Sequence, residues 1–350
     1  MKEAKPAPTL QGIDVTRVGR WLADHIDGLV GPVEFELVSG GRSNLTYRCA
    51  DAAGAVYAMR RPPTGGVLST AHDMSREWRF IRALAATAVP VAPPLAYCAD
   101  TEVTGAEFYV MGFVEGRVLA DRDAGLALAP EARATAGEQL VDVLVALHAI
   151  DPVEVGLGEM VRSAGYVERQ LRRWLSQVHA TGAENLALLD EVHDLLARRI
   201  PEQSTGIVHG DYRPGNLAFG PDGKVRAVFD WELATTGDPM ADLGWLISGW
   251  EHPGDGYPPT TPGPSAVLGF PARAQVAQRY ARLSGRDISN LPFWVAFAQW
   301  RSACIGAGVQ ARYLAGHMAE DGYLDEARAR AEEDSLLLEA AGDALRRLGI

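Results

Sequence analysis

The chain has 350 residues, of which 47% are hydrophobic and 22% charged, so it can bury a large core in one large domain or two lobes. Its 33 basic and 45 acidic residues give a net charge of -12, which argues against a general nucleic-acid binder because such proteins usually carry a basic excess. The cysteines Cys49, Cys98 and Cys304 lie far apart and form no C-x-x-C pair, which predicts buried thiols instead of disulfides or a zinc site. The chain has no signal-peptide pattern and no long apolar run, so we expect a cytoplasmic protein without a membrane span.

The N-terminal third predicts a small sheet with flanking helices. Apolar residues spaced three and four apart predict an amphipathic helix over 14–30 that begins near Asp14 or Thr16. Alternating apolar and polar residues over 33–38 are typical of a half-buried strand. The other elements expected here are strands at 45–49, 55–60 and 107–113 and a helix at 72–86.

Helical patterns dominate after Gly116. The expected helices cover 130–149, 164–180, 185–199, 272–284, 291–315 and 323–348, with short strands near 206–208, 216–219 and 224–229. The sequence therefore predicts an α+β fold with two lobes. A small, mixed antiparallel-sheet lobe spans 1–112, a larger and mainly helical lobe spans 113–350, and a hinge lies near 112–116.

The strongest functional signal lies in the second of these lobes. Residues 209–216 read His-Gly-Asp-Tyr-Arg-Pro-Gly-Asn, and Asp-Trp-Glu follows at 230–232 after a predicted hairpin. Asp211, Asn216 and Asp230 can therefore converge at one edge of the hairpin. Phosphoryl transfer needs such groups, because a carboxylate orients the acceptor hydroxyl while oxygen ligands hold magnesium on the nucleotide.

This segment resembles the aminoglycoside phosphotransferase family, the small-molecule branch of the protein-kinase-like fold. Kinases carry H-R-D-x-x-x-x-N followed by D-F-G, and this chain carries H-G-D-Y-R-P-G-N followed by D-W-E. The resemblance implies that Asp211 is the catalytic base and that Asn216 and Asp230 are metal ligands. Arg213 either contacts the γ-phosphate or is a solvated loop side chain. By the same resemblance, His209 supports the loop, and Asp242 caps a helix or braces the loop.

The chain departs from regulated protein kinases at two points. Gly210 replaces the Arg of their catalytic loop, only 11 residues separate Asp230 from Asp242, and no A-P-E segment follows. A long activation loop has no room here. We therefore expect ATP- and Mg²⁺-dependent transfer to the hydroxyl of a small molecule, by a monomer or homodimer that binds no nucleic acid.

The resemblance also implies a nucleotide site in the first lobe. Gly40, Gly41 and Ser43 lie between two predicted strands, where glycines let backbone N–H groups approach phosphates. Strand alternation puts Ala58 and Arg60 on one face, with Arg in place of the usual phosphate-binding Lys. The carboxylate expected to hold Arg60 is that of Glu77. Backbone groups expected to meet the adenine edge belong to Met111, Phe113 and Val114.

A narrower likeness concerns the acceptor. Arg60-Arg61-Pro62-Pro63 and Phe297-Ala-Gln-Trp-Arg301 are similar to the phosphotransferase domains fused to acyl-CoA dehydrogenases, in which Arg at position 60 is usual. This likeness suggests a hydroxy acid or hydroxyacyl thioester as acceptor, bound near 160–200 and 295–315. Residues considered for the walls of that site are Trp174, Trp294, Trp300, Arg301 and Tyr313. The alternatives are a catalytically silent nucleotide-binding module, an aminoglycoside-type antibiotic kinase and a metal-dependent hydrolase.

Overall fold

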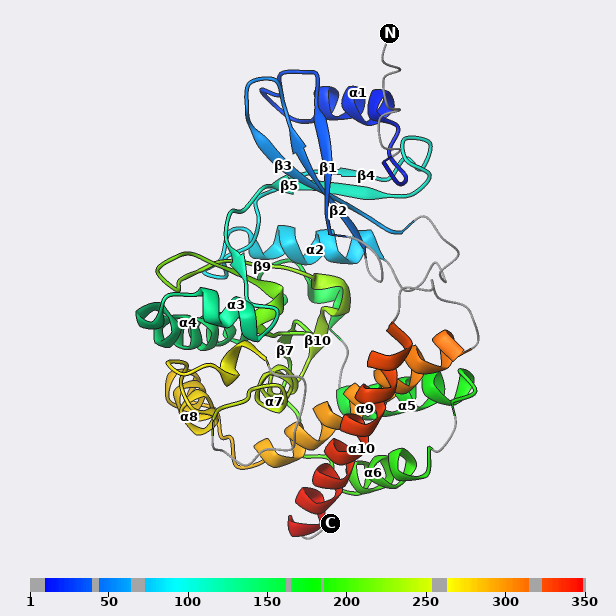
Figure 1. The fold of residues 1–350 in the computed structure, drawn as a ribbon, viewed down its shortest axis with the longest axis vertical. Coiled ribbons are helices and arrows are strands. Elements are labelled where there is room, and N and C mark those ends of the chain that lie inside the picture. The colour runs from blue at the N-terminus through cyan, green and yellow to red at the C-terminus, as the bar shows by residue number, and fades with distance from the viewer. Residues whose placement is uncertain are drawn as a thin grey trace. The chain divides into compact units, whose positions relative to one another are not determined.

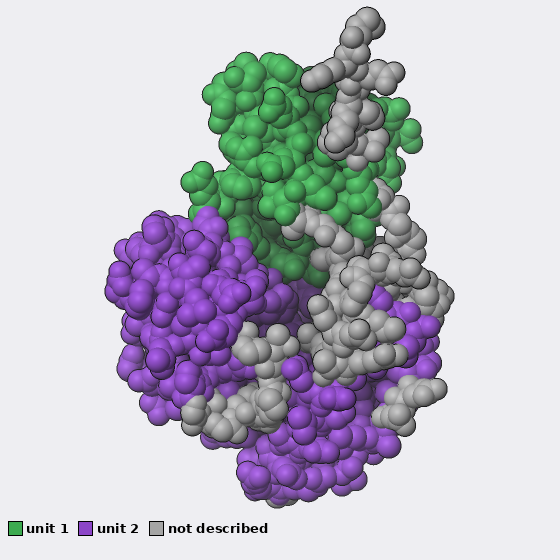
Figure 2. Space-filling view, in the orientation of Figure 1, with its two compact units in different colours: residues 1–115, 227–232 green, residues 116–226, 233–350 purple. Residues whose placement is uncertain are grey.

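The computed structural model describes residues 10–39, 44–63, 73–161, 165–183, 186–253, 263–314 and 323–348. The chain divides into two compact units (Figure 1, Figure 2). The first unit comprises Met1–Glu115 and Ala227–Glu232, and the second comprises Gly116–Arg226 and Leu233–Ile350. The segment 227–232, which carries Asp230, thus returns to the first unit although both of its flanks belong to the second.

A five-stranded antiparallel sheet forms the centre of the first unit. Its strands follow the order β1 (Glu34–Ser39), β2 (Leu45–Ala50), β3 (Val56–Arg61), β5 (Phe108–Gly112) and β4 (Pro94–Cys98). In β2 the buried residues alternate with half-buried ones, as expected for a strand with one face on the core. The pairs β1–β2 and β2–β3 join consecutive strands of the chain in antiparallel fashion, which explains why these strands could be predicted from the sequence.

Two helices flank this sheet in the first unit. Helix α1 (Val15–His25) begins after Asp14, whose carboxylate accepts from the N–H groups of Thr16 and Arg17 at 3.0 Å. Its buried face packs into a core shared with the sheet. Helix α2 (Met74–Leu84) begins after Asp73, whose carboxylate caps it, and runs beside the sheet (Figure 1). This helix carries Glu77 on its buried face.

Strand β4 was not predicted, because prolines precede it and stand at its first residue. Pro90 and Pro93 lie just upstream, and Pro94 opens the strand. Proline donates no ladder hydrogen bond, so it is tolerated at an edge and at a strand's first residue. Here β4 is the edge strand of the sheet, paired only with β5 among the described residues.

The second unit is mainly helical, as predicted. Its longer helices are α4 (Pro130–His148), α5 (Tyr166–Ala180), α6 (Ala187–Arg198), α7 (Met240–Ser248), α8 (Arg273–Ser284), α9 (Leu291–Leu314) and α10 (Tyr323–Arg347), and α3 (Arg122–Ala127) is a short one. Strand β7 (Gly206–Val208) pairs with β10 (Thr235–Gly237), and β6 (Arg117–Val118), β8 (Leu217–Phe219) and β9 (Val225–Val228) form a second small sheet.

Helix α7 was not predicted because it is buried on nearly every side. Its residues from Met240 to Ile247 are almost all buried, so the helix has no polar face and no amphipathic stripe to recognise. A Cβ atom at Gly244 would lie 2.4 Å from the carbonyl oxygen of Trp294 on α9. The missing side chain therefore lets α7 and α9 approach closely. This packing holds α7 against the loop that begins at His209, in the same unit.

The prediction of buried cysteines is confirmed. Cys49, Cys98 and Cys304 are all free and buried, and burial raises the pKa of the Cys49 thiol to about 12. Among the described residues, no helix combines enough length with enough apolar character to cross a membrane.

Candidate active site

The loop from His209 to Asn216 follows β7 in the second unit and is held from several sides. Gly210 has φ +86°, a conformation that glycine adopts at little cost. The Tyr212 side chain is fully buried, and its hydroxyl donates to the carbonyl of Leu140 at 2.8 Å. A short 3-10 turn over Pro214–Asn216 then ends the loop. These contacts fix the backbone between Asp211 and Asn216.

Asp242 on α7 braces the start of this loop. Its carboxylate accepts from the backbone N–H of His209 at 2.7 Å and of Gly210 at 2.8 Å. Burial alone would raise the pKa of Asp242, but the hydrogen bond and charge of His148 outweigh it, and the pKa lies below its ordinary value. A buried, ionised carboxylate thus anchors two consecutive N–H groups, a charge-assisted arrangement that is stronger than neutral hydrogen bonding.

We predict that Gly210→Ala destabilises the second unit by about 1–3 kcal/mol, because the new Cβ would combine an unfavourable φ with a clash. That Cβ would lie 2.7 Å from the carbonyl oxygen of Leu233. Gly156 has a similar φ of +81° but open space around it, so Gly156→Ala measures the cost of the positive φ alone, without a clash. Urea unfolding should show a larger loss of unfolding free energy for Gly210→Ala than for Gly156→Ala. Equal losses would mean that the close approach to Leu233 does not affect stability.

The Asp211 carboxylate accepts hydrogen bonds from three side chains, two on Oδ2 and one on Oδ1. Asn216 Nδ2 donates to Oδ2 at 2.7 Å and also to the Asp211 carbonyl at 2.8 Å. Trp245 Nε1 on α7 donates to Oδ1 at 2.8 Å. Arg213 Nε lies 3.3 Å from Oδ2 with its side chain half exposed. The structure therefore brings together three of the residues expected from the motif, and adds Trp245.

A pocket of about 260 Å³ lies within the second unit, and two of the residues that contact the Asp211 carboxylate line it. Arg213 and Trp245 contribute to its wall, together with Gln299 and Ser302 of α9. Further lining comes from Leu119, Ala120, Pro214, Gly215, Leu246, Ser248, Gly249, Gly263, Pro264, Glu333, Asp334 and Leu337. The pocket thus lies where a small molecule could approach Asp211.

The wall residues expected from the sequence, Trp174, Trp294, Trp300, Arg301 and Tyr313, do not line this pocket. Trp294 and Trp300 are buried in the core, and Trp300 Nε1 donates to the carbonyl of Leu189 at 3.0 Å. Arg301 is also buried and reaches the catalytic loop. Most aromatic side chains of α9 are packed in the core of the second unit. The residues of α9 that line the pocket are Gln299 and Ser302.

In the first unit, Arg60 stands between two carboxylates. Its Nε lies 2.9 Å from Glu77 Oε2, and its Nη2 donates to Asp230 Oδ1 at 2.5 Å. Burial works against the charged form of Arg60, but the carboxylates of Glu77 and Asp230 outweigh it, so the pKa of the guanidinium is raised. The expected pairing of Arg60 with Glu77 is present, and Asp230 joins it.

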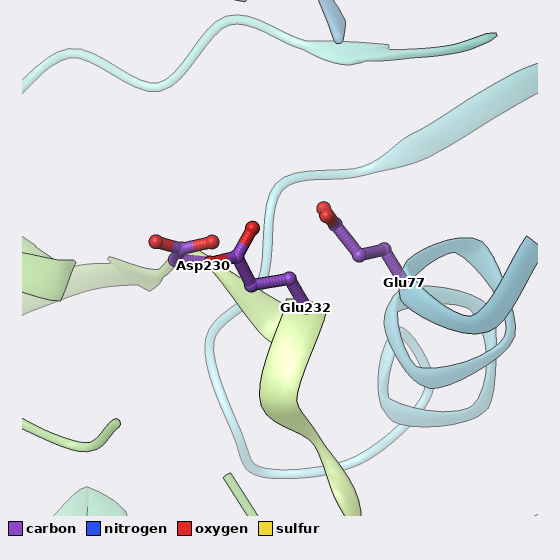
Figure 3. Close-up of side chains that lie close together, drawn as sticks. All are labelled: Glu77, Asp230 and Glu232. Atoms are coloured by element: carbon purple, nitrogen blue, oxygen red, sulfur yellow. The ribbon is translucent and has the colours of Figure 1, made fainter. Parts of the chain in front are cut away.

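Glu77, Asp230 and Glu232 form a cluster of carboxylates whose ligand atoms all lie within 4.8 Å of one another. Figure 3 shows Glu77 extending from α2 toward the other two, which come from the segment after β9. Asn44 Nδ2 joins the cluster, donating to Glu77 Oε1 at 2.5 Å and to Glu232 Oε2 at 3.4 Å. Oxygen donors of this kind suit Mg²⁺, so this half of the site fits the expected ion.

The backbone at Asp230 is unusual. Asp230 has φ +64°, and it alone among the described non-glycine residues has a positive φ. Aspartate tolerates this conformation better than most residues, but it still costs energy and is found preferentially at functional sites. The turn aims the carboxylate toward Arg60 and the cluster.

We predict that Glu77→Gln lowers the free energy of unfolding by about 3 kcal/mol, because it breaks a buried ion pair and leaves Arg60 short of a partner. The Glu77 carboxylate is fully buried and also accepts from the Tyr109 hydroxyl at 2.8 Å. Glu102→Gln changes an exposed glutamate of the same unit and serves as the control. Chemical unfolding followed by circular dichroism measures the free energy of unfolding of both variants. A loss below about 0.5 kcal/mol for Glu77→Gln would show that the Arg60–Glu77 ion pair does not stabilise the fold.

The other residues expected at the nucleotide site lie on strands β3 and β5 and in the segment after β5. Ala58 on β3 is buried and lies opposite Met111 on β5, so the two side chains share one face of the sheet. Phe113 and Val114 follow β5 directly. Gly40, Gly41 and Ser43 lie outside the described residues.

Three residues of the site were missed or underrated from the sequence. Asn44 sits next to the glycine-rich segment, and Glu232 stands two residues after Asp230. Trp245 lies three residues after Asp242 on α7, a spacing that puts both on one helix face. That spacing was the available signal, but it could be used only once α7 was recognised as a helix.

Comparison with known proteins identifies the family. A model of the phosphotransferase enzyme family (APH) matches residues 34–286, which include Asp211 and Asn216 as well as Arg60, Glu77 and Asp230. The chain is 34% identical over 302 residues to acyl-CoA dehydrogenase family member 11 of Gallus gallus, covering 83% of this chain and 38% of the relative. Its human counterpart is 31% identical, with 87% of this chain and 40% of the relative covered. The chain thus spans about two fifths of the length of these relatives.

Solved structures agree on the fold. A protein of Ralstonia eutropha JMP134, described as an aminoglycoside phosphotransferase, superposes with a TM-score of 0.80 at 32% identity, covering 95% of this chain and 98% of that one. The aminoglycoside phosphotransferase APH(4)-Ia, in a ternary complex with AMP-PNP and hygromycin B, gives 0.61 at 17% identity, covering 94% and 98%. The predicted protein-kinase-like fold is confirmed, and the chain belongs to the phosphotransferase enzyme family.

Proposed function

We propose that this chain transfers the γ-phosphate of ATP to a hydroxyl group of a small molecule in a Mg²⁺-dependent reaction. The observation that carries the proposal is the Asp211 carboxylate, fixed on both oxygens by Asn216 and Trp245, with the Trp245 side chain also lining a pocket. A fixed and partly exposed carboxylate beside a pocket suits a group that orients an incoming hydroxyl.

In this proposal the second unit handles the acceptor. Asp211 accepts a hydrogen bond from the acceptor hydroxyl, which aligns its oxygen for attack, and takes the proton as the new bond to phosphorus forms. Arg213, half exposed next to Asp211, offers its guanidinium to the γ-phosphate. Asn216 turns its amide nitrogen to Asp211, so its side-chain oxygen is the atom assigned to the metal.

The first unit handles the nucleotide. Arg60 contacts phosphate oxygens while Glu77 keeps its guanidinium in place, and Asp230 supplies a metal ligand. Bound Mg²⁺ would neutralise negative charge on the phosphates. The backbone of Gly40, Gly41 and Ser43 is assigned to the phosphates. The residues assigned to the adenine are Ala58, Met111, Phe113 and Val114.

The acceptor we propose is a hydroxy acid or hydroxyacyl thioester. This choice is supported by the similarity to acyl-CoA dehydrogenase family member 11 over 83% of this chain. The largely apolar side of the pocket, with Leu119, Leu246 and Leu337, suits a short acyl chain. An aminoglycoside-type kinase is the alternative, supported by fold neighbours such as the complex with hygromycin B. We expect the enzyme to act in the cytoplasm, where ATP and Mg²⁺ are available.

A screen of ADP release tests the proposal and separates these acceptors. Purified protein with ATP and Mg²⁺ is offered hydroxy acids, hydroxyacyl-CoA thioesters, amino sugars and amino alcohols. We expect acceptor-dependent ADP release with a hydroxy acid or hydroxyacyl thioester. Release with amino sugars alone would favour the antibiotic-kinase alternative. Nucleotide binding without release for any class would favour a silent nucleotide-binding module.

A further inference from the structure

We propose that Trp245 is a positioning residue for the catalytic base. Its indole N–H holds the Asp211 carboxylate in one orientation, and the Arg301 guanidinium holds the indole. This inference rests on the proposed function, since it assigns a role within that reaction to Trp245 and Arg301.

The first observation is the pair of hydrogen bonds to the carboxylate. Trp245 Nε1 lies 2.8 Å from Asp211 Oδ1, and Asn216 Nδ2 lies 2.7 Å from Oδ2. A carboxylate turns easily about the bond that carries it, because that torsion has a broad energy profile. Donors on opposite oxygens, from α7 and from the loop itself, remove this freedom. The Asp211 carboxylate is therefore held in one orientation.

The second observation is the contact of Trp245 with Arg301 of α9. The guanidinium carbon lies 4.0 Å from the centroid of the indole ring, and an Nη2 hydrogen bond reaches the carbonyl of Gly210, the residue before Asp211. Arg301 is 4% exposed, so the cation–π contact is largely desolvated, the setting in which it is strongest. One buried cation thus holds both the loop backbone and the indole that reaches the carboxylate.

Trp245 also belongs to the wall of the pocket. A molecule that fills the pocket contacts the side chain that orients Asp211, so the acceptor and the base are aligned against the same indole. A small misalignment of the acceptor and the base lowers the rate of transfer strongly but has little effect on the binding of ATP. Loss of the indole N–H should therefore lower kcat while leaving the KM for ATP unchanged.

Trp245→Phe tests this inference because it keeps an aromatic ring against Arg301 and removes the N–H donor; the accompanying loss of ring size is shared by the control below. With a hydroxyacyl-CoA thioester as acceptor, we expect kcat to fall about 10- to 100-fold, as for a lost hydrogen bond to a charged group, with KM for ATP within about twofold. Trp250→Phe is the matched control. It also removes a buried indole hydrogen bond, to the carbonyl of Pro271 at 2.9 Å, and should leave kcat within about twofold.

A second measurement needs no acceptor. In ¹H–¹⁵N spectra of the full chain, loss of a signal in Trp245→Phe identifies the Trp245 indole N–H. We expect that signal to move in Asp211→Asn while the Trp250 signal stays in place. An unmoved Trp245 signal, or equal losses of kcat in the two tryptophan variants, would overturn the inference. If wild-type protein phosphorylates no acceptor, the proposed function fails, and the indole spectra alone decide whether Trp245 holds Asp211.

Discussion

Asp211→Ala should lower the rate of phosphate transfer by about 10²–10⁴-fold while leaving nucleotide affinity nearly intact. The acceptor hydroxyl loses the group that orients it and takes its proton. The nucleotide keeps Arg60, Glu77 and Asp230, which belong to the other compact unit and make no use of the Asp211 side chain among the described contacts. Steady-state kinetics and calorimetric titration with Mg²⁺ and a non-hydrolysable ATP analogue measure the two effects separately.

Asp222→Ala is the matched control for this experiment. Asp222 lies in the turn between β8 and β9, where its exposed carboxylate pairs with Arg226 at 3.3 Å. An exposed pair of this kind contributes little, so the variant should keep wild-type turnover. Near-normal turnover of Asp211→Ala under the same conditions would reject Asp211 as the base.

Asp230→Ala should weaken binding of Mg·ATP by about 10- to 100-fold or more, because a carboxylate ligand of the metal is lost. The same substitution frees Arg60 from one of its two carboxylates, so binding of ATP in the presence of a metal chelator should stay the same or become tighter. Titration with and without Mg²⁺ reveals this opposite behaviour, which a general loss of folding would not produce.

Asp230→Asn separates the charge from the backbone. Asparagine accepts the positive φ of this position about as well as aspartate, whereas alanine does not. Both variants should lose Mg²⁺-dependent affinity, and only Asp230→Ala should also lose stability. Unchanged Mg²⁺-dependent affinity in Asp230→Asn would remove Asp230 from the metal site.

The sequence predicted most of the fold because most elements carry local signals. Helix α1 has a capping Asp14 before an amphipathic stripe, and β2 shows clean alternation. Elements without such signals were missed. Helix α7 is buried on nearly every side, and β4 begins at Pro94, so the tertiary environment determines them more than their own residue pattern does.

The candidate site divides in the same way. Asp211 and Asn216 stand five residues apart in one loop, and their hydrogen bond could be expected from the motif. The contact of Trp245 with Asp211 spans 34 residues, and that of Asn44 with Glu232 spans 188. No spacing rule reaches across such separations, because they are created by the packing of α7 behind the loop and by the return of segment 227–232 to the first unit.

Transfer of label from the γ-phosphate of ATP to a hydroxyacyl-CoA thioester tests the central claim most directly. Purified wild-type protein with Mg²⁺ should yield labelled acyl-CoA and ADP in equal amounts, and Asp211→Ala should yield neither above the background without enzyme. Equal labelling by the wild type and the Asp211→Ala variant, or ATP binding by the wild type with no labelled product from any hydroxyl acceptor, would contradict the account.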